Sequence, residues 1–167
     1  GNSPAKISTL AMAACEGFLA GGVLPVVKHV PGHGRANVDS HKALPFVEVD
    51  KDTMMASDFV PFKDLSSMPW AMTAHVLYKE LDEDKPATMS AKVIKMIRTD
   101  IGFDGVLLSD DLSMQALDGS FKCRAAGALA AGCDVVLHCN GDMAEMLHVA
   151  SGSIPLHDQA IKRIERA

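Results

Sequence analysis

The chain has 167 residues, of which 48% are hydrophobic and 22% are charged, a composition typical of one soluble globular domain and unlike that of a disordered segment. The formal net charge of −5 and the lack of a Lys/Arg cluster argue against nucleic acid as a partner. No apolar stretch approaches the roughly 18 residues of a membrane span, so we also expect no membrane partner.

The four cysteines, Cys15, Cys123, Cys133 and Cys139, lie in Ala-rich or strand-like apolar segments. None of them has the C-x-x-C spacing of zinc or redox sites. We therefore expect free thiols in a reducing compartment, which favours a cytoplasmic protein. The opening residues do not have the pattern of a signal peptide.

The first predicted element is a helix. Asn2 or Ser3 is a suitable N-cap, Pro4 suits the first turn, and apolar residues follow at helical spacing: Ile7, Leu10, Ala11, Ala14 and Phe18. Two glycines then end the pattern, and a β-branched apolar run at 23–27 predicts the first strand.

The remaining segments alternate between helix and strand. A polar loop with several glycines occupies residues 31–41, and a loop of this length is usually functional or mobile. The pattern beyond it predicts, in chain order, a weak helix at 50–60, a strand at 69–76, a helix at 91–101, a strand at 106–110, a helix at 123–131, a strand at 133–138 and a last helix at 155–165.

Apolar strands separated by helices indicate parallel βα units with both sheet faces covered. Four such units are visible, and polar residues mark the carboxyl end of each strand, where parallel barrels place their catalytic groups: Lys28, His29, Thr73, His75, Ser109, Asp110, His138 and Asn140. A closed (β/α)8 barrel needs eight strands and roughly 250 residues, so four units would make half of one. A free-standing doubly wound sheet is the alternative, although no Gly-x-Gly-x-x-Gly follows the first strand.

The most specific feature is Lys-His-Val-Pro-Gly-His-Gly at 28–34, followed by Asp-Ser-His at 39–41. These motifs resemble the signature of the β-N-acetylglucosaminidases in glycoside hydrolase family three, with Val30 in place of the usual Phe. The resemblance covers essentially the whole chain and continues through three more segments: 72–75, 86–90 and 102–114. It implies a (β/α)8 TIM barrel in the parent protein. Residues 1–167 would be the C-terminal half of that single catalytic domain, roughly strands five to eight.

Asp39 and His41 are the predicted acid/base pair. A glycosidase needs a proton donor beside the leaving oxygen, usually a carboxyl group. Here a histidine two residues after an aspartate can be oriented by that carboxylate, which also favours the imidazolium. The matching family residues form this dyad. Without the resemblance, a turn-capping aspartate and a solvated histidine would be the simpler interpretation.

Asp110 is the predicted nucleophile. Period-two alternation places it on one face of its strand with Val106 and Leu108, and it points into the barrel mouth if that face is the interior. A carboxylate there can form a glycosyl-enzyme that water hydrolyses with retention. Asp111 has the opposite parity, and the family's nucleophile is the first acidic residue of Ser-Asp-Asp. Without the motif, Asp110 could equally cap the following helix.

Lys28 and His29 match family residues that hydrogen-bond sugar hydroxyls, and His75 is a weaker candidate for the same role. A zinc site formed by His29, His33 and His41 is disfavoured, because the three lie on a strand end and an irregular loop. We expect neither a metal nor another cofactor.

The resemblance implies an exo-acting retaining hydrolase that removes terminal N-acetylglucosamine from muropeptides in bacterial cell-wall recycling. The alternative is a catalytically incomplete fragment that at most binds sugar, since the family places an Asp and an Arg for substrate binding on the first half of the barrel. Phosphorolysis with the same residues is a variant, because a histidine acid/base repels phosphate less than a carboxylate does.

Overall fold

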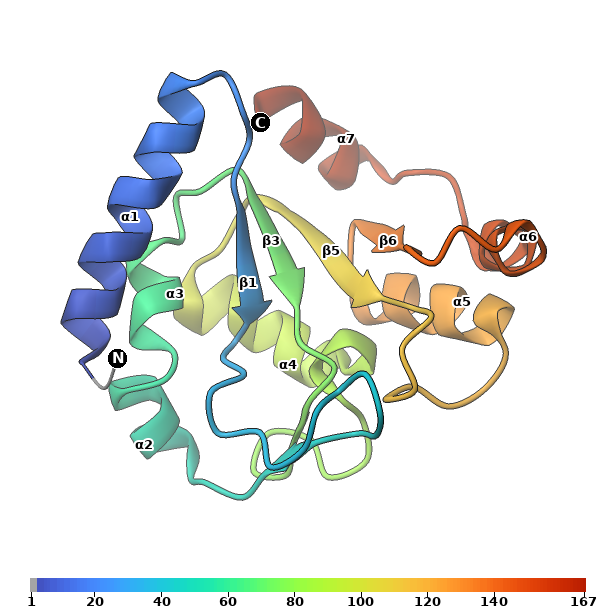
Figure 1. Ribbon diagram of the computed structural model, residues 1–167, viewed down its shortest axis with the longest axis horizontal. Coiled ribbons are helices and arrows are strands. Elements are labelled where there is room, and N and C mark those ends of the chain that lie inside the picture. Colours follow the sequence, from blue (N-terminus) through green and yellow to red (C-terminus); the bar gives the residue numbers. More distant parts are fainter. Residues whose placement is uncertain (1–2) are drawn as a thin grey trace.

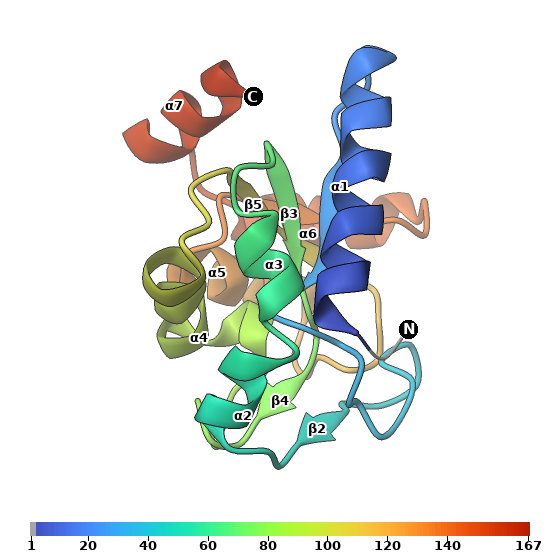
Figure 2. The ribbon, with the colours of Figure 1, turned by 90° about the vertical axis from the view of Figure 1, so that its left-hand side faces the viewer.

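A computed structural model describes residues 3–167, and its main feature is a sheet of four parallel strands (Figure 1). In spatial order these are β1 (Val26–Val30), β3 (Trp70–Thr73), β5 (Val106–Asp111) and β6 (Val135–Leu137). A small parallel sheet of β2 (Phe46–Val47) and β4 (Leu77–Tyr78) lies beyond the carboxyl ends of the main strands (Figure 2). The four parallel strands expected from the sequence are confirmed.

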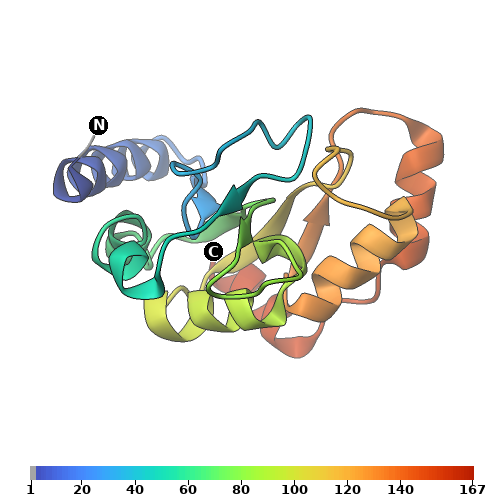
Figure 3. The same ribbon diagram turned by 90° about the horizontal axis from the view of Figure 1, so that it is seen from below.

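Helices connect and flank the strands. Those of the described residues are α1 (Pro4–Ala20), α2 (Lys51–Ala56), α3 (Val60–Asp64), α4 (Ala91–Met96), α5 (Phe121–Ala131), α6 (Met143–Gly152) and α7 (Asp158–Arg166), with the short turns η1 (Ala87–Met89) and η2 (Ile97–Ile101). Seen from below, α4 and α5 lie on one face of the sheet, and the loop after β1 lies on the opposite side (Figure 3). Within residues 3–167, no helix is both long and apolar enough to cross a membrane.

The strand order separates the two fold alternatives. The four main strands lie side by side in the order in which they occur along the chain, all parallel. A doubly wound sheet reverses its direction of winding and carries helices on both faces. Winding in one direction, with α4 and α5 on one face, is instead the arrangement of a TIM barrel (Figure 3). The chain therefore has a TIM-barrel-like α/β fold with a parallel sheet, while the count of eight strands stays a prediction.

Helix caps set several of these boundaries. The Ser3 side chain accepts a hydrogen bond from the Lys6 N–H and caps α1, as one of the two predicted caps; the other, Asn2, lies outside the described residues. Ser90 caps α4 in the same way through the Val93 N–H. The helix expected at 91–101 spans those residues but ends in a π-helical turn, η2, before Gly102 with a φ of 82°.

Some boundaries differ from the prediction. The strand expected at 23–27 begins only at Val26, after Pro25, which has no N–H to donate to a ladder. The weak helix expected at 50–60 is only α2, which ends at Ala56; a separate helix, α3, begins at Val60 with Pro61 in its first turn. The strand expected at 69–76 ends at Thr73.

Helix α6 was not predicted. The Asp142 carboxylate caps it by accepting from the N–H groups of Ala144 and Glu145. The apolar residues Met143, Met146 and Leu147 stand at helical spacing and are exposed in the structure.

The main hydrophobic core lies between the sheet and the helices on its covered face. Ala71 and Leu107 of the strands pack there with Val93 and Ile97 of α4 and η2 and with Ala128 of α5. All five side chains are almost completely buried. This packing fixes the orientation of the strands, and through them the residues at their carboxyl ends.

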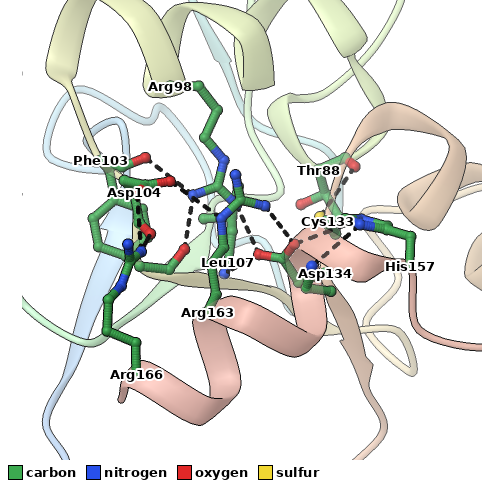
Figure 4. Close-up of polar contacts among 12 residues, drawn as sticks. Thr88, Arg98, Phe103, Asp104, Leu107, Cys133, Asp134, His157, Arg163 and Arg166 are labelled. Carbon is green, nitrogen blue, oxygen red and sulfur yellow. Dashed lines mark hydrogen bonds and ion pairs between the residues drawn. The ribbon is translucent and has the colours of Figure 1, made fainter.

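A polar network closes the opposite, amino end of the sheet (Figure 4). The Asp134 carboxylate has no exposed surface and accepts hydrogen bonds from the Leu107 N–H at 2.9 Å, Arg98 at 2.7 Å and Arg163 at 2.8 Å. Arg163 and Arg166 also bind Asp104. Because both arginines belong to α7, the network attaches the last helix to the sheet, at the end away from the predicted site (Figure 1).

Candidate active site

The predicted site residues lie at and beyond the carboxyl ends of the strands (Figure 1). Lys28 and His29 belong to β1, Asp110 belongs to β5, and Asp39 and His41 lie on the loop after β1. That loop runs on the side of the sheet away from α4 and α5, where the interior of a barrel would be (Figure 3). The fold thus gathers five of the six predicted side chains at one open edge.

Asp110 is 7% exposed and occupies the end of β5. The Asp111 N–H donates to its Oδ1 at 2.9 Å, and His29 Nε2 lies 3.6 Å from its Oδ2. The carboxylate therefore has one fixed oxygen, and its other oxygen faces a side chain from β1. A carboxylate held in this way at a strand end can attack an electrophilic carbon placed above it.

Asp111 makes contacts of a different kind. Its carboxylate accepts from the N–H and the hydroxyl of Ser113, at 2.9 and 2.6 Å, and from the Cys139 N–H at 3.1 Å. Burial alone would raise its pKa, but these hydrogen bonds hold the pKa of Asp111 below its ordinary value. Asp111 thus joins the ends of β5 and β6, and this geometry favours Asp110 as the nucleophile.

The Asp39–His41 pair is formed. His41 Nδ1 lies 2.8 Å from Asp39 Oδ1, and the same oxygen accepts from the His41 backbone N–H at 3.0 Å. The backbone and side-chain hydrogen bonds from His41 lower the pKa of Asp39, so its carboxylate is ionised and Nδ1 carries the proton. Both side chains are exposed, 55% for Asp39 and 75% for His41, and within residues 3–167 neither binds Asp110 directly.

The loop that carries this pair is held at its base. The Tyr78 hydroxyl donates to the Gly32 carbonyl at 2.5 Å, and Arg35 Nε binds Asp58 Oδ2 at 2.7 Å. Nearer the pair, the buried Ser40 lies between its two members, and its hydroxyl is 3.2 Å from His33 Nε2. The start of the loop is therefore fixed, and Asp39 and His41 lie in its exposed part.

His29 is the side chain of β1 nearest to the nucleophile. Burial lowers its pKa, although the neighbouring Asp110 acts in the opposite direction, so the ring is neutral near pH 7. Its ring also contacts His33 edge to face, with 5.6 Å between the ring centroids. Lys28 beside it is exposed and adds a positive charge to this edge.

His75, the sixth predicted residue, is completely buried. Its Nδ1 lies 2.8 Å from the Thr88 hydroxyl, and its Nε2 lies 3.0 Å from the Asp111 carbonyl oxygen. Thr88, which the sequence analysis did not single out, is thus part of the site's support. The only sequence signal for Thr88 is its place in the motif at 86–90.

No group of three or more His, Cys, Asp or Glu side chains within residues 3–167 is arranged to hold a metal ion. Of the three histidines considered for zinc, His29 faces Asp110, His33 contacts Ser40, and His41 binds Asp39. The four cysteines are all free thiols.

Comparison with known proteins identifies the family. A family model described as the glycosyl hydrolase family 3 N terminal domain matches residues 1–167, and the chain belongs to that family. A beta-hexosaminidase of Methylobacillus flagellatus is 40% identical over 166 residues, which cover 96% of this chain and 47% of the relative. The chain spans about half the length of the curated relatives it matches, which are named beta-hexosaminidase.

Solved structures show the same similarity. NagZ from Neisseria gonorrhoeae, in complex with N-trifluoroacetyl-D-glucosamine, is 37% identical with a TM-score of 0.82, over 95% of this chain and 46% of that one. A family 3 β-N-acetylglucosaminidase from Paenibacillus sp. is 29% identical with a TM-score of 0.85, over 95% of this chain and 32% of that one.

Proposed function

We propose that this chain carries the catalytic residues of a retaining exo-β-N-acetylglucosaminidase that removes terminal β-linked N-acetylglucosamine. One observation carries the proposal: a carboxylate fixed at a strand end, Asp110, lies at the same sheet edge as an exposed loop with a hydrogen-bonded Asp39–His41 pair. The first group serves as nucleophile and the second as proton donor, the two functions that glycoside hydrolysis needs.

In the first step, Asp110 attacks the anomeric carbon and the bond to the leaving oxygen breaks. His41 gives that oxygen its Nε2 proton, because Nδ1–H is engaged with Asp39. In the second step, a water molecule gives a proton to Nε2 and displaces Asp110, which restores the carboxylate and yields the sugar with its original configuration. Asp39 stabilises the imidazolium that is present before the first step and restored in the second, and between the steps it keeps the proton of the neutral ring on Nδ1.

We assign Lys28 and His29 to the sugar hydroxyls. The Lys28 ammonium is exposed and donates only, and the neutral His29 ring lies close enough to Asp110 for one sugar ring to contact both. The N-acetylglucosamine derivative bound to the Neisseria relative supports an acetamido sugar as the substrate class. The family resemblance extends this to muropeptide fragments of peptidoglycan, and the free thiols favour the cytoplasm.

We further propose that this domain supplies four strands, numbers five to eight, of a (β/α)8 barrel. A groove of about 850 Å³ between α1 and β1 exposes apolar side chains that include Phe18, Leu24 and Val26. A preceding βα unit would cover such a surface and pair with the edge of β1. The 167-residue chain alone is then catalytically incomplete, because the sugar contacts of the other half-barrel are lacking.

Phosphorolysis by the same residues is the second candidate. The proton donor is a histidine at an exposed position, which repels phosphate less than a carboxylate would. Phosphate in place of water would yield the sugar 1-phosphate instead of the free sugar.

The test uses the complete parent polypeptide and p-nitrophenyl N-acetyl-β-D-glucosaminide, with the product followed by NMR. We expect release of the free β-anomer and loss of turnover on Asp110→Asn, whereas Asp118→Asn, in an exposed loop, retains activity. An initial α-anomer, or turnover that survives Asp110→Asn, would refute the proposal. Sugar 1-phosphate formed only in phosphate buffer would favour phosphorolysis. The 167-residue chain alone should be inactive, and its full activity would overturn the half-barrel assignment.

A further inference from the structure

His75 lies between the ends of β3 and β5, directly beneath the site edge, and has no exposed surface. Its Nε2 lies 3.0 Å from the carbonyl oxygen of Asp111. A carbonyl oxygen can only accept a hydrogen bond, so Nε2 carries a proton and donates it. The ring therefore connects β3 to the backbone of the residue that follows the nucleophile.

The other ring nitrogen fixes the orientation of the ring. Nδ1 lies 2.8 Å from the Thr88 hydroxyl, which also lies 2.8 Å from the Thr73 hydroxyl. Burial lowers the pKa of His75 and prevails over the opposite influence of Asp110 and Asp111, so the ring is neutral. The neutral Nδ1 accepts from the Thr88 hydroxyl, whose single proton is shared with the Ala74 carbonyl oxygen at 3.1 Å, and Thr88 accepts in turn from Thr73. Both hydroxyls are completely buried, and each has a partner.

One residue transmits this arrangement to the nucleophile. Asp111 accepts the His75 hydrogen bond at its carbonyl and donates its own N–H to Asp110 Oδ1 at 2.9 Å. On the side of β6, its carboxylate is held by the N–H groups of Ser113 and Cys139. The backbone at Asp111 is thus fixed from both neighbouring strands, and its N–H is aimed at one oxygen of the nucleophile.

We propose that His75 is a positioning residue for Asp110: it holds the Asp111 peptide so that the Asp111 N–H orients the attacking carboxylate. This inference rests on the proposed role of Asp110, and it replaces the expectation that His75 contacts the sugar. A buried ring whose two nitrogens both have protein partners has no free polar atom for a sugar hydroxyl.

The two roles predict different kinetics. A sugar ligand contributes to binding of the ground state, so its loss raises KM. A positioning residue leaves the sugar contacts of Lys28 and His29 in place, and its loss lowers kcat because the carboxylate no longer stays aligned. Misplacement of a reacting group by about 1 Å costs roughly 100-fold in rate.

The experiment compares two matched pairs in the complete parent enzyme, with kcat and KM measured per folded molecule. The amide of His75→Gln can still donate to the Asp111 carbonyl, whereas His75→Met has similar size and cannot. Thr88→Ser keeps the hydroxyl on Nδ1, whereas Thr88→Val removes it with little change of shape. We expect kcat to fall about 100-fold in His75→Met and several-fold in Thr88→Val, with KM unchanged and with activity largely restored in His75→Gln and Thr88→Ser.

A raised KM with unchanged kcat in His75→Met would instead make His75 a sugar ligand and overturn the inference. Unchanged kcat and KM in folded His75→Met would reduce the residue to packing and overturn it as well. If His75→Met does not fold, the Thr88 pair decides: equal kcat in the Ser and Val variants contradicts the proposal. Lack of turnover in the wild-type enzyme would refute the proposed function itself, which keeps the two failures distinct.

Discussion

His29 Nε2 and Asp110 Oδ2 lie 3.6 Å apart, although their strands, β1 and β5, are separated by β3. In the interior of a parallel barrel the side chains of alternate strands lie in one layer, which accounts for a contact across β3. The neutral ring leaves the negative charge of Asp110 largely uncompensated, and a nucleophilic carboxylate keeps its reactivity in such a setting.

The Asp39–His41 pair predicts a dependence on the leaving group. His41→Ala should lower kcat/KM about 10²- to 10⁴-fold for a disaccharide, whose leaving oxygen needs a proton. The same change should have little effect on p-nitrophenyl or more acidic aryl leaving groups, which depart without one. Asp39→Asn should follow the same pattern more weakly. A series of aryl glycosides gives the measurement, and an equal loss for all leaving groups would contradict the role of His41 as acid.

A side chain at position 32 should strain the backbone at the base of the loop. Its φ is +150°, and a Cβ there would lie 3.3 Å from the Asp58 carbonyl oxygen. We expect Gly32→Ala to destabilise the fold by about 1–3 kcal/mol, because a side chain is unfavourable in that conformation. Gly34→Ala is the matched control, since its Cβ would meet nothing within 4 Å. Urea unfolding gives the stability of both variants, and equal midpoints for Gly32→Ala and Gly34→Ala would contradict the predicted strain at Gly32.

We expect substitution of Asp134, at the amino end of the sheet, to lower the free energy of unfolding strongly. Its loss leaves Arg98 and Arg163 without their buried partner, so we expect Asp134→Ala to destabilise the fold by about 3–5 kcal/mol. Asp104 binds the same helix but is 67% exposed, and Asp104→Ala should cost about 1 kcal/mol or less. Hydrogen exchange should show α7 opening in the first variant. If the free energy of unfolding fell equally in both variants, the stronger role assigned to the buried Asp134 would be contradicted.

The half-buried His29 and the fully buried His75 predict a dependence of stability on pH. His29 and His75 have lowered pKa values in the fold, so the unfolded chain binds more protons than the folded chain as the pH falls below about 6.5. The free energy of unfolding should therefore decrease from pH 8 to pH 5. His75→Gln should make this slope smaller, and His148→Gln, at an exposed position, should not. An unchanged slope in His75→Gln would show that His75 does not resist protonation.

Much of this arrangement could be predicted from local sequence. The alternation along β5 predicted opposite orientations for Asp110 and Asp111, and the structure gives the two carboxylates different partners, although the register of β5 with β6 shifts between Leu108 and Asp111. The hydrogen bond of Asp39 and His41 follows from residues only two apart, so it needs no tertiary information. The parallel strands followed from their continuous apolar character.

Other features depend on contacts between distant segments. The burial of His75 results from its contacts with Thr88 and with the end of β5, 36 residues away at Asp111, and a polar residue after a strand gives no sign of either. Helix α6, by contrast, was missed although Met143, Met146 and Leu147 recur at helical spacing after its cap Asp142. The role of Asp134 requires two arginine-bearing segments, η2 with Arg98 and α7 with Arg163, to meet at the start of β6 (Figure 4).

The most direct test of the central claim is covalent trapping of Asp110. The complete parent enzyme is incubated with an N-acetylglucosaminyl fluoride that carries a second ring fluorine to slow hydrolysis of the intermediate. The digested protein is then sequenced by mass spectrometry, with fragment ions that separate Asp110 from Asp111. We predict a glycosyl ester on Asp110 alone, which is lost in Asp110→Asn. An ester on Asp111, or rapid turnover without any ester on the protein, would contradict this account.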